Sequence, residues 1–191
     1  MPPLPKISKE DIINKALNIA RCENFNSINA RRLAKELGCS VQPIFSNFKN
    51  MEELKKVVFS KICELFYETI TKLGESDIPK YKQVGINYIK FAKNEPNIFK
   101  LIFLENNNYQ IEDELFTDRN NYYIKIKNLI ENATGLEQRE IPSFHLKMWI
   151  FTHGLATLVA SKCTFTDEEI NDLLTSEFKA LLAIEKEGLE K

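Results

Sequence analysis

The chain of 191 residues is long enough for a small domain joined to a larger one. Hydrophobic residues make up 43% and charged residues 28%, a normal globular balance that provides a sizeable core, and the net charge of −1 gives the chain as a whole no nucleic-acid signal. No apolar run approaches the roughly 18 residues that cross a membrane, and the N-terminus lacks the apolar centre of a secretory signal, so we expect a cytoplasmic protein with no membrane partner.

The first predicted elements are three helices. Residues 8–23 repeat apolar side chains at helical spacing, and Ser8 and Asp11 have the spacing of a capping box. A short helix at about residues 30–37 is capped by Asn29 and ended by Gly38. A second short helix is predicted from a cap at Ser40 to about residue 47.

The rest of the chain is also predicted to be helical. A long helix covers residues 50–73, and further helices are predicted at about residues 79–93, 95–105, 112–133, 142–163 and 167–187. The chain has only six glycines and seven prolines, and no strand-like alternation or internal repeat is present. The predicted fold class is all-α, with about nine helices.

Charge is distributed unevenly along the chain. Residues 1–60 hold ten Lys and Arg against six Asp and Glu, whereas residues 61–191 hold sixteen against twenty-one. A basic N-terminal part on an acidic body is expected when only one end meets phosphate. The four cysteines lie far apart without a C-x-x-C pair, and we interpret Cys22, Cys39, Cys63 and Cys163 as small buried hydrophobic residues, with no metal site and no cofactor.

The segment from Asn29 to Phe48 has the pattern of a helix-turn-helix. Two short helices are joined by a tight turn at Gly38, and the apolar positions that would fix their crossing angle are Leu33, Ala34, Leu37, Ile44 and Phe48. From the spacing alone, an ordinary helix pair in a bundle remains an alternative.

Residues 8–59 resemble the TetR family of transcriptional regulators. The resemblance rests on Leu33-Ala34, on Leu37-Gly38 and on Ile44-Phe45-x-x-Phe48 before a long helix. The sequence departs from the family at Asn24, where Gly is usual, at Phe45, where Tyr is usual, and at Met51, where Lys is common. The resemblance implies a DNA-binding domain at residues 1–50 and a helical ligand-binding and dimerisation domain at residues 51–191.

The recognition segment provides the candidate DNA contacts. Gln42 is the expected base reader because Gln can form two hydrogen bonds with adenine, and the arginines and lysine would position the protein on the phosphates. Ser40 is expected to cap its helix and to contact phosphate. The full predicted set is Arg31, Arg32, Ser40, Val41, Gln42, Phe45, Ser46, Asn47 and Lys49.

The helical body provides candidates for a ligand pocket and for a dimer interface. Aromatic residues at helical spacing can line a cavity or fill a core, and the pocket candidates are Tyr67, Tyr88, Phe103, Tyr122, Tyr123 and Trp149. The resemblance implies that the last two helices pair with those of a second copy. The residues expected in that interface are Trp149, His153, Leu155, Leu158, Leu174, Phe178 and Leu181.

A Trp149-x-x-x-His153-Gly154 pattern, together with Tyr88-x-x-Phe91-Ala92, resembles elements of one group of TetR C-terminal domains. We interpret His153 as a histidine packed at an interface and Gly154 as a point of close approach for another helix. No carboxylate pair or Ser-His-Asp order accompanies His153, so we predict no catalytic residues and no enzyme.

The combined prediction is a repressor that leaves a palindromic operator in double-stranded DNA when a small-molecule effector binds, with the helix at residues 50–73 as the connection. An enzyme or carrier built on a helical bundle, and an interaction module that has lost DNA binding, remain the alternatives. DNA affinity and its salt dependence separate these classes.

Overall fold

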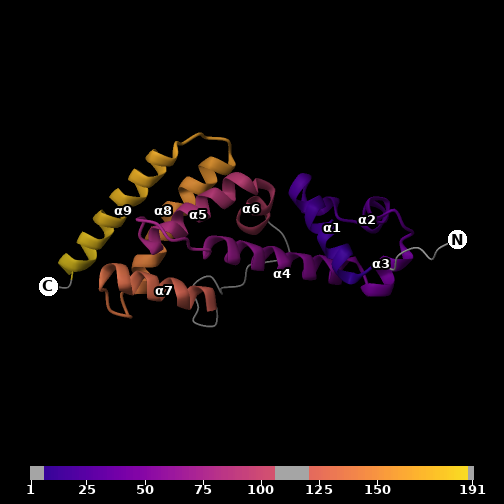
Figure 1. Cartoon of the computed structure of the whole chain (residues 1–191), viewed down its shortest axis with the longest axis horizontal. Helices are drawn as coiled ribbons and strands as arrows, with labels where there is room; N and C mark the ends of the chain where they lie inside the picture. The colour runs from indigo at the N-terminus through magenta and orange to yellow at the C-terminus, as the bar shows by residue number, and fades with distance from the viewer. Residues whose placement is uncertain (1–6, 106–120, 189–191) are drawn as a thin grey trace. The chain divides into compact units, whose positions relative to one another are not determined.

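The computed structural model describes residues 7–105 and 121–188, and every regular element within those ranges is helical (Figure 1). This confirms the predicted all-α class. The N-terminal part of the helix predicted at residues 112–133 lies outside the described residues. The elements are α1 (Lys9–Cys22), a 3-10 turn η1 (Phe25–Ser27), α2 (Ala30–Leu37), α3 (Gln42–Asn47), α4 (Met51–Ile70), α5 (Lys80–Asn94), α6 (Pro96–Phe103), α7 (Asn121–Thr134), α8 (Ile141–Ala160) and α9 (Asp167–Gly188).

Helix starts follow local capping chemistry. The Ser8 hydroxyl oxygen accepts a hydrogen bond from the Asp11 backbone N–H (3.0 Å), and the Asp11 carboxylate accepts one from the Ser8 backbone N–H (2.9 Å). These hydrogen bonds favour the charged carboxylate and lower the pKa of Asp11. Thr166 and Glu169 repeat the same arrangement at the start of α9. The capping box predicted at Ser8 and Asp11 is therefore confirmed.

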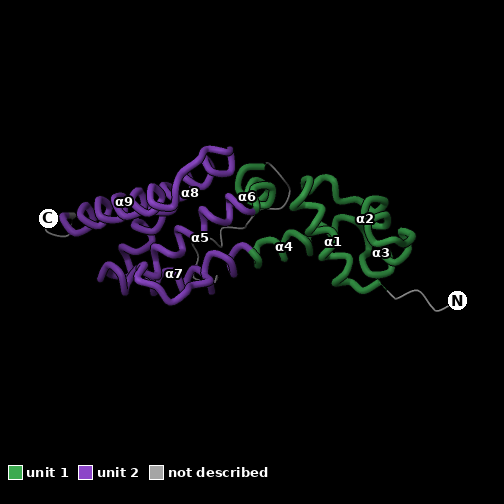
Figure 2. The backbone as a smooth tube through the Cα atoms, turned by 45° about the horizontal axis from the view of Figure 1, so that its top comes forward, with its two compact units in different colours: residues 1–65, 95–110 green, residues 66–94, 111–191 purple. Residues whose placement is uncertain are grey.

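The chain divides into two compact units (Figure 2). The first contains residues 1–65 and 95–110, and the second contains residues 66–94 and 111–191. The division falls within α4, so this helix contributes residues to both units. The domain boundary predicted at residue 50 rests on the family resemblance and stays a prediction.

The core of the first unit is formed by α1, α2, α3 and the start of α4. Ile12, Leu33, Ile44 and Leu54 have no exposed surface, and Phe48 retains 2%. Helix α6 packs against α1, although it is distant in sequence: the Asn97 side-chain amide donates to the Arg21 carbonyl (2.8 Å). The Arg21 guanidinium also pairs with the Glu95 carboxylate (3.0 Å). The sequence analysis did not place α6 with the N-terminal helices.

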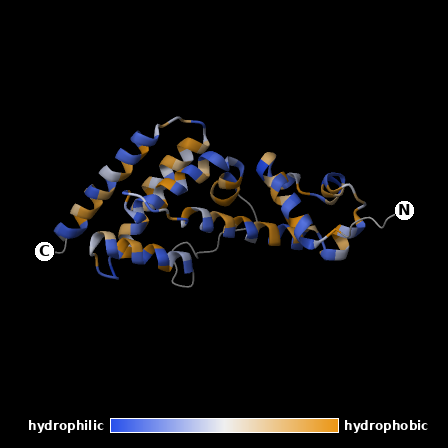
Figure 3. Cartoon of the chain, viewed as in Figure 1, coloured by the Kyte–Doolittle hydropathy of each residue, from blue (hydrophilic) through white to orange (hydrophobic). Residues whose placement is uncertain are grey.

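The second unit is a helical bundle in which α5 packs along α8, and α9 packs against both. Apolar and polar residues are distributed over different faces of these helices (Figure 3). Phe144 is fully buried and meets the half-buried Phe178 edge to face at 5.5 Å between ring centroids. Phe66, at the end of α4, packs edge to face on Phe91 at 5.2 Å. Burial of such aromatic side chains is a major source of bundle stability.

The cysteine prediction is wrong for the two residues at helix ends. Cys22 and Cys163 are exposed, and Cys39 and Cys63 are half-buried. Cys22 ends α1, and Cys163 lies in the connection after α8, so neither position faces a core. Composition alone cannot show this, because burial depends on the face and the end of the helix that a residue occupies.

Candidate nucleic-acid interface and cavity

The turn between α2 and α3 is built on Gly38. This residue has φ 63° and ψ 33°, the left-handed conformation that glycine adopts without steric cost. The Cys39 backbone N–H donates to the Ala34 carbonyl (3.0 Å), which closes the end of α2. The reversal brings the buried side chains of Leu33 and Ile44 into one core, as the pattern predicted.

Helix α3 starts at Gln42, one residue later than a cap at Ser40 would place it. Val41 occupies the N-cap position without a side-chain hydrogen bond, so the prediction that Ser40 caps this helix is wrong. With Ser40 as the cap, Pro43 would be the third helical residue, and a proline there has no N–H to donate to the cap hydroxyl. Ser40 itself is exposed in the connecting turn.

The exposed side of α3 is partly apolar. Phe45 is 47% exposed and Val41 is 40% exposed, one helical turn apart, and Gln42 is exposed beside them. Two of the predicted polar contacts donate hydrogen bonds within their own helix: the Ser46 hydroxyl to the Gln42 carbonyl (3.0 Å) and the Asn47 amide to the Pro43 carbonyl (2.8 Å). No hydrogen bond of the Gln42 side chain is seen among the described residues, and this side chain is exposed to solvent.

The basic residues of the first unit differ in their surroundings. The Arg32 guanidinium pairs with the carboxylates of Glu23 (2.6 Å) and Glu36 (3.2 Å), whereas Arg31 is exposed. Lys49 is also exposed, at the connection between α3 and α4. Arg31 and Lys49 carry positive charge toward solvent, while two carboxylates neutralise much of the charge of Arg32.

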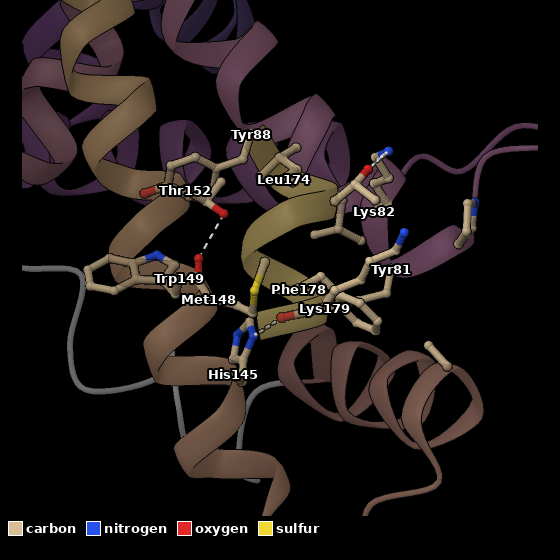
Figure 4. A pocket seen from close by; sticks show the side chains of 15 residues that line it. Tyr81, Lys82, Tyr88, His145, Met148, Trp149, Thr152, Leu174, Phe178 and Lys179 are labelled. Atoms are coloured by element: carbon tan, nitrogen blue, oxygen red, sulfur yellow. Dashed lines mark hydrogen bonds between the residues drawn. The ribbon is translucent and has the colours of Figure 1, made fainter. Parts of the chain in front are cut away.

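The second unit has a partly open cavity of about 360 Å³ lined mainly by α5, α8 and α9 (Figure 4). This volume lies at the lower end of the range for small-molecule sites, roughly 300–1,000 Å³. Its lining is mostly apolar and aromatic. The lining residues include Tyr81, Lys82, Val84, Gly85, Tyr88, His145, Met148, Trp149, Thr152, Leu174, Thr175, Phe178 and Lys179.

The structure places only some of the predicted pocket residues at this cavity. Tyr88 and Trp149 line it. Tyr67 and Tyr122 instead stack on each other, with ring centroids 4.9 Å apart and an interplanar angle of 8°. Phe103 ends α6 and belongs to the first unit.

Both histidines of the chain pair with tyrosines of α5. The Tyr81 hydroxyl lies 3.0 Å from Nδ1 of His145, and the Tyr88 hydroxyl lies 2.9 Å from Nδ1 of His153. Burial lowers the pKa of His145 to about 4, so its imidazole is neutral at physiological pH. Burial also raises the pKa of Tyr81, which therefore remains protonated. The sequence analysis missed these pairs because the partners are 64 and 65 residues apart.

His153 also stacks on Trp149, at 4.9 Å between ring centroids and 22° between planes. These two residues of the Trp149-x-x-x-His153 pattern therefore lie one turn apart on α8 and contact each other. Within the described ranges no group of three or more His, Cys, Asp and Glu side chains could hold a metal ion. No helix in the described part of the chain is both long and apolar enough to cross a membrane.

The predicted dimer residues fall into two groups. Leu155, Leu174 and Leu181 are buried within the chain, whereas Leu158 is 46% exposed. Four further exposed apolar residues of α8 and α9 were not in the predicted interface set. These are Leu146 (44%), Ile150 (58%), Leu173 (36%) and Ile184 (58%).

Leu146, Ile150, Gly154 and Leu158 are spaced four residues apart and form one stripe along α8. Apart from its chain neighbours and the backbone of its own helix, no described atom would lie within 4 Å of a Cβ added at Gly154. Gly154 therefore makes no close helix approach within the described part of the chain. The four-residue spacing of these positions could have predicted the stripe from the sequence.

No protein-family model matches the sequence, and no curated protein matches it. Solved structures do match. The chain is similar to a TetR-family transcriptional regulator from Haemophilus influenzae, with a TM-score of 0.65 and 18% identity over 90% of this chain and 94% of that one. It is also similar to a TetR-family protein from Vibrio parahaemolyticus, with a TM-score of 0.63 and 14% identity over 90% and 97%. A transcriptional regulator from Rhodococcus sp. Rha1 matches with a TM-score of 0.56 and 13% identity over 93% and 97%.

The architecture shared with these structures is all-helical, with an N-terminal helix-turn-helix and a C-terminal helical bundle. The chain has the fold of the TetR-family transcriptional regulators.

Proposed function

We propose that this protein is a DNA-binding transcriptional regulator whose helix α3 enters the major groove of duplex DNA. The observation that carries the proposal is the exposed face of α3, formed by Val41, Gln42 and Phe45 on a helix whose opposite side is anchored by the buried Ile44. A helix held in this way behind a glycine turn can insert its N-terminal side chains between the phosphate backbones. Such a protein would work in the cytoplasm, with the DNA.

The same face suggests how bases are read. Gln42 would form paired hydrogen bonds with adenine, and the apolar Val41 and Phe45 would contact the methyl groups of thymine. Arg31 and Lys49 would hold the phosphates. We therefore expect half-sites that contain A·T pairs where α3 lies deepest in the groove.

The functional protein would be a homodimer. The stripe of Leu146, Ile150, Gly154 and Leu158 on α8 is apolar and exposed, and α9 adds Leu173 and Ile184. A second copy pairing the same two helices would cover these residues, and the open surface at Gly154 would allow close contact with the partner. Two copies would supply two recognition helices for a palindromic operator.

The cavity of the second unit would bind a small-molecule effector. Ligand binding would favour one arrangement of the dimer, and α4, which contributes to both units, would connect the cavity to the recognition helices. The ligand can shift DNA affinity only by the ratio of its affinities for the DNA-bound and free forms. The protein would then act as a repressor released from its operator.

DNA binding tests this proposal. Fluorescence anisotropy of the full chain would be measured on a selected operator and on a random duplex, with wild type, Gln42→Ala and Lys49→Ala. We expect Gln42→Ala to lose affinity for the operator by roughly five- to a hundredfold and little affinity for the random duplex. Lys49→Ala should weaken both to a similar degree. Equal losses on both duplexes for Gln42→Ala would contradict the base-reading role.

A further inference from the structure

The cavity of the second unit has a largely apolar interior, and three of its polar side chains already form hydrogen bonds within the chain. The Thr152 hydroxyl donates to the Met148 carbonyl (2.8 Å), and the Tyr81 hydroxyl pairs with His145, as the dashed lines in Figure 4 show. The Thr175 hydroxyl donates to the Asn171 carbonyl (2.6 Å). These contacts leave aromatic and aliphatic surface for the body of a ligand.

Two lysines also line this cavity, Lys82 from α5 and Lys179 from α9. In Figure 4, Lys82 lies across the cavity from Trp149. The Lys82 ammonium donates a hydrogen bond to the Thr175 hydroxyl, whereas Lys179 has no hydrogen bond or ion pair among the described residues. Burial lowers the pKa of Lys82, Asp172 opposes this effect, and the charge of Lys179 adds to it.

The charges near these lysines limit what the cavity can accept. Two lysines line the cavity and no Asp or Glu does, so no lining carboxylate offsets their positive charge. A cationic ligand would meet this excess charge. The interior adds no charge of its own, because His145 is neutral at physiological pH. An amphipathic ligand with one negative charge would match both the apolar interior and the charged side.

We propose that the cavity binds a monocarboxylic acid with an apolar body, which packs against Met148, Trp149 and Leu174 while its carboxylate pairs with Lys82 and Lys179. This inference rests on the proposed function in one respect, which is that the bound acid acts as the effector of DNA binding. Binding itself can be measured without DNA.

Trp149 reports on the cavity directly, because it is the only tryptophan of the chain and lines the cavity wall. Its fluorescence would be followed while the full chain is titrated with 4-phenylbutyrate, 4-phenylbutan-1-ol and 4-phenylbutylamine, which share one body and differ in charge. Decanoate, decan-1-ol and decylamine would repeat the series with an aliphatic body. We expect the carboxylates to bind roughly five- to tenfold more tightly than the alcohols, and the amines to bind most weakly.

The double variant Lys82→Met/Lys179→Met tests the origin of that preference. It should bind carboxylate and alcohol equally, with the alcohol affinity within roughly twofold of wild type. Lys93→Met is the matched control, because Lys93 is exposed on the same helix as Lys82 and does not line the cavity. Its carboxylate preference should equal that of wild type.

Three results would overturn the inference: no binding of either carboxylate up to about 1 mM, alcohols binding as tightly as carboxylates, or a preference that survives in the double variant.

Operator binding, measured separately in the presence of each compound, distinguishes this inference from the proposed function. Carboxylate binding without any change in DNA affinity would contradict effector control but not the ligand class. Release of the operator by the alcohols with no preference for the carboxylates would contradict the ligand class alone.

Discussion

Acid should destabilise the protein through His145. The folded state holds this imidazole buried, and its pKa is lowered from 6.5 to about 4. The unfolded chain therefore binds a proton more readily than the folded chain between these two values. The contribution of neutral His145 to the free energy of unfolding is fully present above the pKa that His145 has in the unfolded chain. It is lost as the pH falls toward the pKa of the folded state. One pKa unit corresponds to about 1.4 kcal/mol, so lowering the pH from about 7.5 to about 5 should cost about 2 kcal/mol through this residue.

Urea denaturation of wild type and His145→Gln at both pH values measures the effect. The Gln variant lacks the titrating group, and any loss of the hydrogen bond with Tyr81 lowers its stability equally at both pH values. We expect the free energy of unfolding of wild type to fall by about 2 kcal/mol more than that of the variant. His153, whose pKa burial also lowers, is present in both proteins, so its contribution cancels. Equal falls in the two proteins would refute the argument.

Three further changes test other parts of the account. Ile150→Glu should raise the dimer dissociation constant by at least roughly tenfold in sedimentation analysis. Ile124→Glu, on an exposed apolar residue of α7, should leave the dimer intact, and equal effects of the two would contradict the interface. Gly85→Ala should raise stability by roughly 0.5–1 kcal/mol in thermal denaturation, because the nearest atom to the added Cβ, 3.4 Å away, ends the flexible Leu174 side chain; a loss would show that α5 and α9 cannot adjust. Lys49→Ala should reduce the salt-dependence slope of DNA binding by about one, and an unchanged slope would exclude a phosphate contact.

Features encoded within a few residues could be predicted from the sequence. The turn at Gly38 needs a left-handed residue, and a glycine between two short apolar repeats indicates that turn directly. The capping boxes at Ser8 and Thr166 involve partners three residues away, so the same short window that suggests them also contains their chemistry. The cap was wrongly assigned to Ser40 because serine is a common capping residue, whereas the structure has Val41 at the N-cap and Pro43 in the first turn of α3.

Features that depend on distant partners could not be predicted in the same way. The Tyr81–His145 and Tyr88–His153 contacts join α5 to α8, and nothing in the local sequence of either helix indicates the other partner. The apolar periodicity of α8 shows that the helix is largely hydrophobic, but it does not show which leucines face the bundle. Leu155 proved to be buried and Ile150 exposed, because α5 and α9 determine the inner face of α8.

Selection of binding sites from a random library of duplex DNA tests the central claim most directly. The full-length protein would be incubated with the library, and bound duplexes would be sequenced after successive rounds. We predict enrichment of one palindromic motif with A·T pairs in each half-site, and loss of preference at a defined position of each half-site for Gln42→Ala. If no motif is enriched over the starting library at low salt, the protein does not read DNA through α3, and the account is contradicted.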